Sequence, residues 1–87
     1  MEIKTSSQAG TDESCDILIQ VSPSNTLNIT VESRVEKLYG DTIRSVIQST
    51  LKDLNITTGT ITAKDNGALD YTIRARVKAA VAQGAIP

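Results

Sequence analysis

Residues 27–54, LNITVESRVEKLYGDTIRSVIQSTLKDL, decide the fold class because the spacing of the apolar residues changes partway along this stretch. Apolar and polar residues alternate over 27–32, which predicts a strand with one buried face. Ser33 and Glu36 then fit a capping box at the start of a helix, and Asn55 fits its end. Spacings of three and four predict one buried stripe on that helix, made of Val35, Leu38, Tyr39, Ile43, Val46, Ile47, Leu51 and Leu54.

The segments on either side extend this stretch into an α+β fold. Residues 16–21 alternate and predict another strand, and the turn cluster 22–25 predicts that it pairs with 27–31 as an antiparallel hairpin. Residues 58–63 predict a third strand. Residues 68–84 predict a second helix, capped by Asp65 or Asn66, with a buried stripe of Leu69, Ile73, Val77, Ala80 and Val81. The order ββαβα predicts a small two-layer sandwich with both helices on one face of the sheet.

Length and composition limit what this chain does. A chain of 87 residues fits a single domain, 1–87, whose residues 1–9 either stay flexible or add a short edge strand. The net charge of −1 and the scarcity of aromatic residues argue against nucleic-acid binding. The N-terminus has no hydrophobic signal region and no stretch has transmembrane length, so we expect a cytoplasmic protein that does not bind membranes.

Catalytic chemistry has little support in this sequence. The chain has no histidine and only one cysteine, and its carboxylates are scattered, so neither a nucleophilic triad nor a metal site is indicated. We therefore expect a protein that is not itself an enzyme. A covalently attached group is the economical source of reactivity, and Ser14 is a candidate position for it, in the acidic loop 10–16 that we expect to be solvent-exposed. The alternative is that Ser14 serves only turn formation.

Charged residues near Ser14 suggest how another protein would recognise the loop. Asp12, Glu13 and Asp16 flank the serine and are predicted to attract a basic enzyme surface, although they would also serve simply to keep the loop solvated. Arg74 and Arg76 give the second helix a basic side, which is the alternative recognition surface.

Three segments carry a resemblance to a known family: AGTDES at 9–14, VEKLYGDTIR at 35–44, and DNGALD at 65–70, which leads into Arg74-Ala75-Arg76. In their order and separation they resemble the acyl carrier proteins, or gamma subunits, of citrate lyase, and the resemblance covers nearly the whole chain. A glycine commonly follows the modified serine in that family, whereas this chain has Cys15.

The resemblance implies a function and a set of partners. Ser14 would carry 2′-(5″-phosphoribosyl)-3′-dephospho-coenzyme A through a phosphodiester, and the thiol of that group would bear the acetyl or citryl thioester while citrate is cleaved to acetate and oxaloacetate. The implied partners are the alpha (acyl transferase) and beta (acyl lyase) subunits in a hetero-oligomeric complex, and a prosthetic-group transferase. Two alternatives remain open: the carrier subunit of malonate decarboxylase, which uses a similar group, and a non-covalent protein-interaction module.

Overall fold

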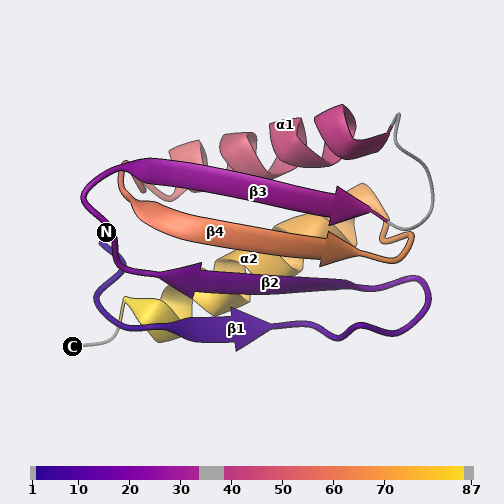
Figure 1. The fold of residues 1–87 in the computed structure, drawn as a ribbon, viewed down its shortest axis with the longest axis horizontal. Helices are drawn as coiled ribbons and strands as arrows, with labels where there is room; N and C mark the ends of the chain where they lie inside the picture. Colours follow the sequence, from indigo (N-terminus) through magenta and orange to yellow (C-terminus); the bar gives the residue numbers. More distant parts are fainter. Residues whose placement is uncertain (1, 34–38, 86–87) are drawn as a thin grey trace.

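The computed structural model describes residues 2–33 and 39–85, which form a sheet with two helices behind it (Figure 1). The elements in chain order are β1 (Ser7–Ala9), β2 (Ile17–Ser22), β3 (Leu27–Ser33), α1 (Tyr39–Asp53), β4 (Gly59–Asp65) and α2 (Asp70–Gly84). The predicted two-layer α+β sandwich is confirmed. Of the two outcomes expected for residues 1–9, the edge strand forms, as β1.

The strand order in the sheet is β1-β2-β4-β3. β2 runs antiparallel to both of its neighbours, whereas β3 and β4 are parallel. Parallel neighbours need a crossover connection, and α1 supplies it between β3 and β4. This β3–α1–β4 unit places β4 inside the sheet, where Gly59, Ile61, Ala63 and Asp65 are all buried.

The predicted hairpin between residues 16–21 and 27–31 is wrong. β2 and β3 follow each other in the chain, but β4 lies between them and pairs with both. Burial explains the arrangement, because the inward side chains Ile61 and Ala63 of β4 are fully buried, whereas Leu27 at the start of β3 is 41% exposed. β3 has the most regular alternation in the sequence, yet it is an edge strand, since alternation reports a buried face and not the identity of the neighbouring strand.

The core lies between the helices and the inner face of the sheet. Its buried apolar side chains are Ile17, Ile19 and Val21 of β2, Ile61 and Ala63 of β4, Ile43, Val46, Ile47 and Leu51 of α1, and Ile73, Val77, Ala80 and Val81 of α2, with Ile3 and Ile56 at its margin. Each large side chain in this set contributes roughly 1.5–3 kcal/mol by leaving water. The packed strands and helices are therefore a rigid support for the loops at either end.

The predictions at the two helix starts have different outcomes: the capping box falls partly outside the described residues, and the predicted burial of Leu69 is wrong. Ser33 ends β3 and its hydroxyl donates to Asp65 Oδ2 at 3.2 Å, while Glu36 of the predicted capping box lies outside the described residues, as do Val35 and Leu38 of the predicted stripe. Leu69 is 60% exposed. Leu69 has an extended backbone and precedes the first residue of α2. Its side chain therefore does not continue the buried stripe of that helix.

Asn55 ends α1, as predicted. Its φ of 58° is in the left-handed region, its amide donates to the Lys52 carbonyl at 3.0 Å, and the Ile56 amide donates to the Leu51 carbonyl at 2.9 Å. These two bonds form a Schellman motif, which satisfies carbonyls at the end of the helix. The chain can then turn into β4.

The last turn of α2 is covered by the start of the chain. The amides of Lys4 and Thr5 donate to the Gly84 carbonyl at 2.8 and 3.0 Å, and the Ser7 hydroxyl donates to the Ala80 carbonyl at 2.6 Å. These bonds fix β1 against the helix. Within the two described ranges, no helix has both the length and the apolar character needed to cross a membrane.

Candidate functional site

Ser14 lies in the loop between β1 and β2, at the end of the sheet where β4 stops and α2 begins (Figure 1). Residues 11–15 are exposed, so the predicted exposure of the loop is confirmed for the serine and its immediate neighbours. Asp16 is the exception, with 9% of its surface exposed. The loop therefore has an accessible tip and a buried base.

A tight turn over residues 13–16 presents the Ser14 side chain. The Asp16 amide donates to the Glu13 carbonyl at 3.3 Å and closes the turn. Cys15, at the third position, has a φ of 64°, which costs a non-glycine residue roughly 1–3 kcal/mol. Glycine adopts this conformation without that cost. This is a physical reason for the glycine that commonly follows the modified serine in the family that the sequence resembles.

Asp16 anchors the base of the loop through an ion pair with α2. Its two carboxylate oxygens accept from Arg76 Nε at 3.0 Å and Nη2 at 3.1 Å, and they also accept from the Thr11 hydroxyl and the Ile17 amide. The bidentate guanidinium is the main reason that the pKa of Asp16 falls from 3.8 to about 2, since these bonds outweigh the cost of burial. Asp16 is therefore ionised at neutral pH and ties the loop to the helix.

Asn66, in the connection from β4 to α2, holds the loop from the other side. Its carbonyl accepts from the Cys15 amide at 2.8 Å, and its own amide donates to the Asp16 carbonyl at 2.9 Å. Its side-chain nitrogen donates to both the carbonyl and Oδ1 of Asp12, at 2.9 and 2.8 Å. Residues on both sides of Ser14 are thus fixed by one asparagine, while the serine itself lies exposed between them.

Gly10 allows the loop to leave β1 at this angle. Its φ is +92°, and a Cβ added to it would lie 1.9 Å from the Ile17 carbonyl oxygen and 3.2 Å from the Cδ of Arg76. No side chain fits there without moving the backbone. The glycine at the head of the loop is therefore required by the close approach of the two backbone segments.

The acidic residues predicted to take part in recognition occupy two different environments. Asp12 and Glu13 are exposed at the tip of the loop. Asp16 is buried and paired with Arg76. Its position favours a structural role.

Arg74 and Arg76 do not form the shared basic face that the sequence suggested. Successive residues of an α-helix are about 100° apart, so two residues at i and i+2 point to opposite flanks. Arg74 Nη1 lies 3.4 Å from the Thr50 hydroxyl of α1, whereas Arg76 faces Asp16 in the loop. The structure brings Arg76 to the site and leaves Arg74 at the interface between the helices.

Sequence reasoning assigned Asp65 and Asn66 to the start of α2 and missed their role at the loop. Asp65 instead accepts from the amides of Gly67 and Ala68 at 3.1 and 3.0 Å, which shapes the turn that carries Asn66. The signal available in the sequence was the segment 65–70, which belongs to the resemblance although it lies far from Ser14 in the chain.

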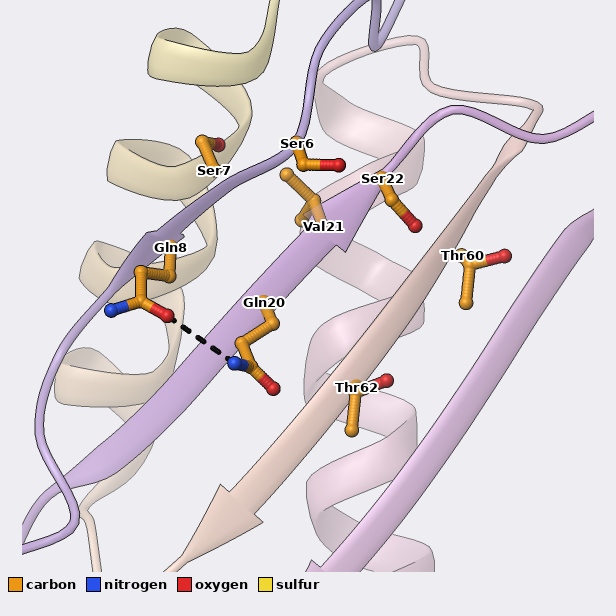
Figure 2. A pocket seen from close by; sticks show the side chains of 8 residues that line it. All are labelled: Ser6, Ser7, Gln8, Gln20, Val21, Ser22, Thr60 and Thr62. Atoms are coloured by element: carbon orange, nitrogen blue, oxygen red, sulfur yellow. Dashed lines mark hydrogen bonds between the residues drawn. The ribbon is translucent and has the colours of Figure 1, made fainter.

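A hollow of about 500 Å³ lies on the outer face of the sheet, toward the end opposite to Ser14. Figure 2 shows that Gln20 and Ser22 of β2 and Thr60 and Thr62 of β4 project into it, and Gln20 Nε2 donates to Gln8 Oε1 at 3.2 Å. Its lining has hydroxyls and amides and no acid or base. Across 2–33 and 39–85, no cluster of three or more histidine, cysteine or acidic residues is suited to a metal ion.

Comparison with known proteins defines the class of this chain. A family model described as malonate decarboxylase delta subunit (MdcD) matches residues 4–84. The fold also matches that of a chain in a Pseudomonas malonate decarboxylase hetero-tetramer in complex with malonate, with a TM-score of 0.80 over 93% of this chain and 84% of that one, at 17% identity. A protein of Thermus thermophilus gives 0.72 at 12% identity over 95% of this chain and 16% of that one. The class is that of the small acyl carrier subunits.

Closer relatives give the particular family. The chain is 51% identical to the citrate lyase acyl carrier protein of Latilactobacillus sakei over 97% of its length and 84% of that protein. It is 48% identical to the citrate lyase acyl carrier protein of Streptococcus mutans over 98% of its length and 85% of that protein. The chain belongs to the citrate lyase acyl carrier protein family. Membership confirms the prediction of a non-catalytic carrier.

Proposed function

We propose that this chain is the acyl carrier subunit of a citrate lyase, and that Ser14 carries 2′-(5″-phosphoribosyl)-3′-dephospho-coenzyme A through a phosphodiester. The observation that supports this most is the exposed serine at the tip of a turn that Asn66 and Asp16 brace on both sides. The names of the relatives favour citrate lyase. The carrier subunit of malonate decarboxylase is the second candidate, favoured by the description of the matching family model.

The surroundings of Ser14 suit a phosphodiester. α2 begins at this end of the sheet, and the N-terminus of a helix carries a partial positive charge that favours anions. Arg76 is 40% exposed and uses Nε and Nη2 for Asp16, which leaves other N–H donors of its guanidinium available beside the loop. Arg76 therefore offers a hydrogen-bond donor to a phosphodiester at Ser14, in a neighbourhood where Asp12, Glu13 and Asp70 add negative charge.

The bound group supplies a terminal thiol that carries the acyl cargo as a thioester, so the chain itself needs to supply only attachment and presentation. The brace formed by Asn66 and Arg76 limits movement of the loop relative to the core. Since the chain has no histidine, and the side chains next to Ser14 are the exposed carboxylate of Glu13 and the thiol of Cys15, we assign activation of the serine hydroxyl to a separate transferase.

The proposed partners follow from this role. They are the alpha and beta subunits of citrate lyase and the prosthetic-group transferase, in the cytoplasm. The similar fold found in a malonate decarboxylase hetero-tetramer supports assembly with other subunits. For the transferase, Asp12 and Glu13 at the tip are the proposed recognition residues, and we assign Asp16 the task of holding the loop.

Intact mass and peptide mapping test the attachment. Co-expression with the transferase should add the mass of the group to the peptide that contains Ser14, and expression without the transferase should leave the serine bare. Ser14→Ala should abolish both loading and citrate cleavage by the reconstituted complex. Ser45→Ala, which removes an exposed hydroxyl from α1, is the matched control and should load fully. Loading of the Ser14→Ala protein would contradict the proposal.

A further inference from the structure

A second hollow, of about 650 Å³, lies between α1 and the segment that joins β4 to α2. Most of its walls are apolar and come from both helices and from the turn between β4 and α2: Ile43, Ala68, Leu69, Tyr71 and Ile73. Leu69 is 60% exposed and Tyr71 is 71% exposed. Among the side chains whose exposure the structure describes, only Leu27, at the other end of the sheet, is a comparable exposed apolar residue.

The turn that lines this hollow also holds the loop that carries Ser14. Asp65, Gly67 and Ala68 line the hollow, and Asn66, within the same turn, bonds to Asp12 and Cys15 on either side of the serine. A group attached to Ser14 would therefore start from a loop that is hydrogen-bonded to the turn that lines the hollow. Such tethering gives a high effective concentration, so even a weak site would be occupied.

The charges in the lining restrict what can bind. Asp65 and Asp70 line the hollow, and no lysine or arginine does so within the described ranges. Asp65 is buried, with its carboxylate accepting from Ser33, Gly67 and Ala68. Carboxylates beside an apolar wall repel phosphate groups and anionic acyl cargo. They suit a neutral, flat group with N–H donors, and an exposed tyrosine offers such a group a ring to stack on.

We propose that this hollow is a base-binding site that takes the adenine of the nucleotide carried on Ser14. The inference rests on the proposed function, since it needs a nucleotide at that serine. Tyr71 supplies the stacking surface, Leu69 and Ile43 supply apolar contact, and the carboxylate of Asp70 accepts from the exocyclic amino group. Docking the base leaves the acyl-bearing thiol outside the hollow, where a partner subunit can reach it.

The test compares free ligands on the unmodified chain, so it does not depend on loading. Titration of the ¹⁵N-labelled protein with 3′-dephospho-coenzyme A should shift the amides of Ala68, Leu69, Tyr71 and Ile73, whereas pantetheine, which lacks the base, should not. Tyr71→Phe should bind as the parent does. Tyr71→Ala should bind at least roughly fivefold more weakly, because a stacked base is worth about 1 kcal/mol or more. Leu27→Ala, an exposed apolar residue elsewhere, should change nothing.

Three results would overturn the base-binding site, two in the titration and one in the loaded chain. Equal shifts with pantetheine would mean that the arm and not the base occupies the hollow, and an absence of shifts in residues 68–73 would mean that the base does not bind there. A second test compares the amide shifts of the loaded chain, verified by mass, with those of the unmodified chain. Shifts confined to residues 10–16 would refute the base-binding site while leaving attachment at Ser14 intact. Absence of the adduct from Ser14 would instead refute the attachment and leave the titration to decide the site.

Discussion

Ser7 and Ser14 lie at opposite ends of the molecule and show two uses of the same side chain. The Ser7 hydroxyl donates to the Ala80 carbonyl at 2.6 Å and helps to fix β1 on the last turn of α2. Ser14 is exposed, and its loop is held by Asn66 and by the Asp16–Arg76 pair. At one end the hydroxyl contributes to the fold. At the other end the fold holds the hydroxyl in an accessible position, which is the arrangement that a modification site requires.

This difference depends on bracing residues that lie outside the immediate neighbourhood of Ser14 in the chain. Asn66 and Arg76 come from the connection after β4 and from α2, so the loop is fixed only once β2, β4 and α2 are assembled. Variants of the brace, in which Asp12 accepts from Asn66, should therefore alter both stability and presentation of the serine, whereas a variant of the exposed Glu13 side chain should alter recognition alone.

The largest expected effect on stability is that of Gly10→Ala. The added Cβ would lie 1.9 Å from the Ile17 carbonyl oxygen at a φ of +92°, so the backbone must shift, at a cost of about 2 kcal/mol or more. Urea denaturation should show the loss, and loading should slow. Gly40→Ala is the matched control: a Cβ there meets no atom within 4 Å, and the helix should gain roughly 0.5–1 kcal/mol. Unchanged stability of Gly10→Ala would show that the loop is not held as described.

The second-largest effect on stability should come from acid, which weakens the ion pair between Asp16 and Arg76. The pKa of Asp16 is lowered to about 2 in the folded chain, so its contribution is fully present above the unfolded value of 3.8 and is lost as the pH falls toward 2. Allowing for the partial exposure of Arg76, the contribution is about 1–2 kcal/mol. Denaturation between pH 5 and 2 should show it as extra acid sensitivity that Asp16→Asn lacks and Glu13→Gln retains. If Asp16→Asn keeps the parent's acid sensitivity, the ion pair does not stabilise the loop.

Ser7→Ala should have a smaller effect on stability, of about 1 kcal/mol, because it removes one hydrogen bond between β1 and the end of α2. The midpoint of thermal unfolding should fall, while loading at Ser14 should stay at the parent's rate. The exposed neighbour Ser6 provides the control, since Ser6→Ala should leave the midpoint unchanged. A loss of loading in Ser7→Ala without a loss of stability would remove the distinction between the two serines.

The smallest effect is expected from the exposed carboxylates at the tip. Replacing Asp12 and Glu13 by Asn and Gln should slow modification by the transferase a few-fold at low salt and scarcely at high salt, since exposed charges act mainly on the encounter rate and are screened by salt. The rate of adduct formation at two salt concentrations measures this. If both the rate and its salt dependence equal those of the parent, recognition lies elsewhere on the molecule.

Local sequence patterns determined the elements of this protein and the candidate serine. The change in the spacing of apolar residues after residue 32 predicted the strand and the helix that follows it, and Asn55 predicted the end of that helix. The small polar residues ahead of β2 predicted an exposed loop. The resemblance in three separated segments gave the family. These inferences succeeded because periodicity, capping and turn preference depend on residues a few positions apart.

Long-range contacts decided the rest. The position of β4 between β2 and β3 and the pairing of Asp16 with Arg76 both depend on residues far apart in the chain. A strand's alternation is the same whichever neighbour it has, and a carboxylate's sequence neighbours do not reveal a guanidinium that is 60 positions away. The sequence alone could therefore propose Ser14, but only the packed sheet and helices determine that its loop is held on both sides and is bonded to the turn that lines a mostly apolar hollow.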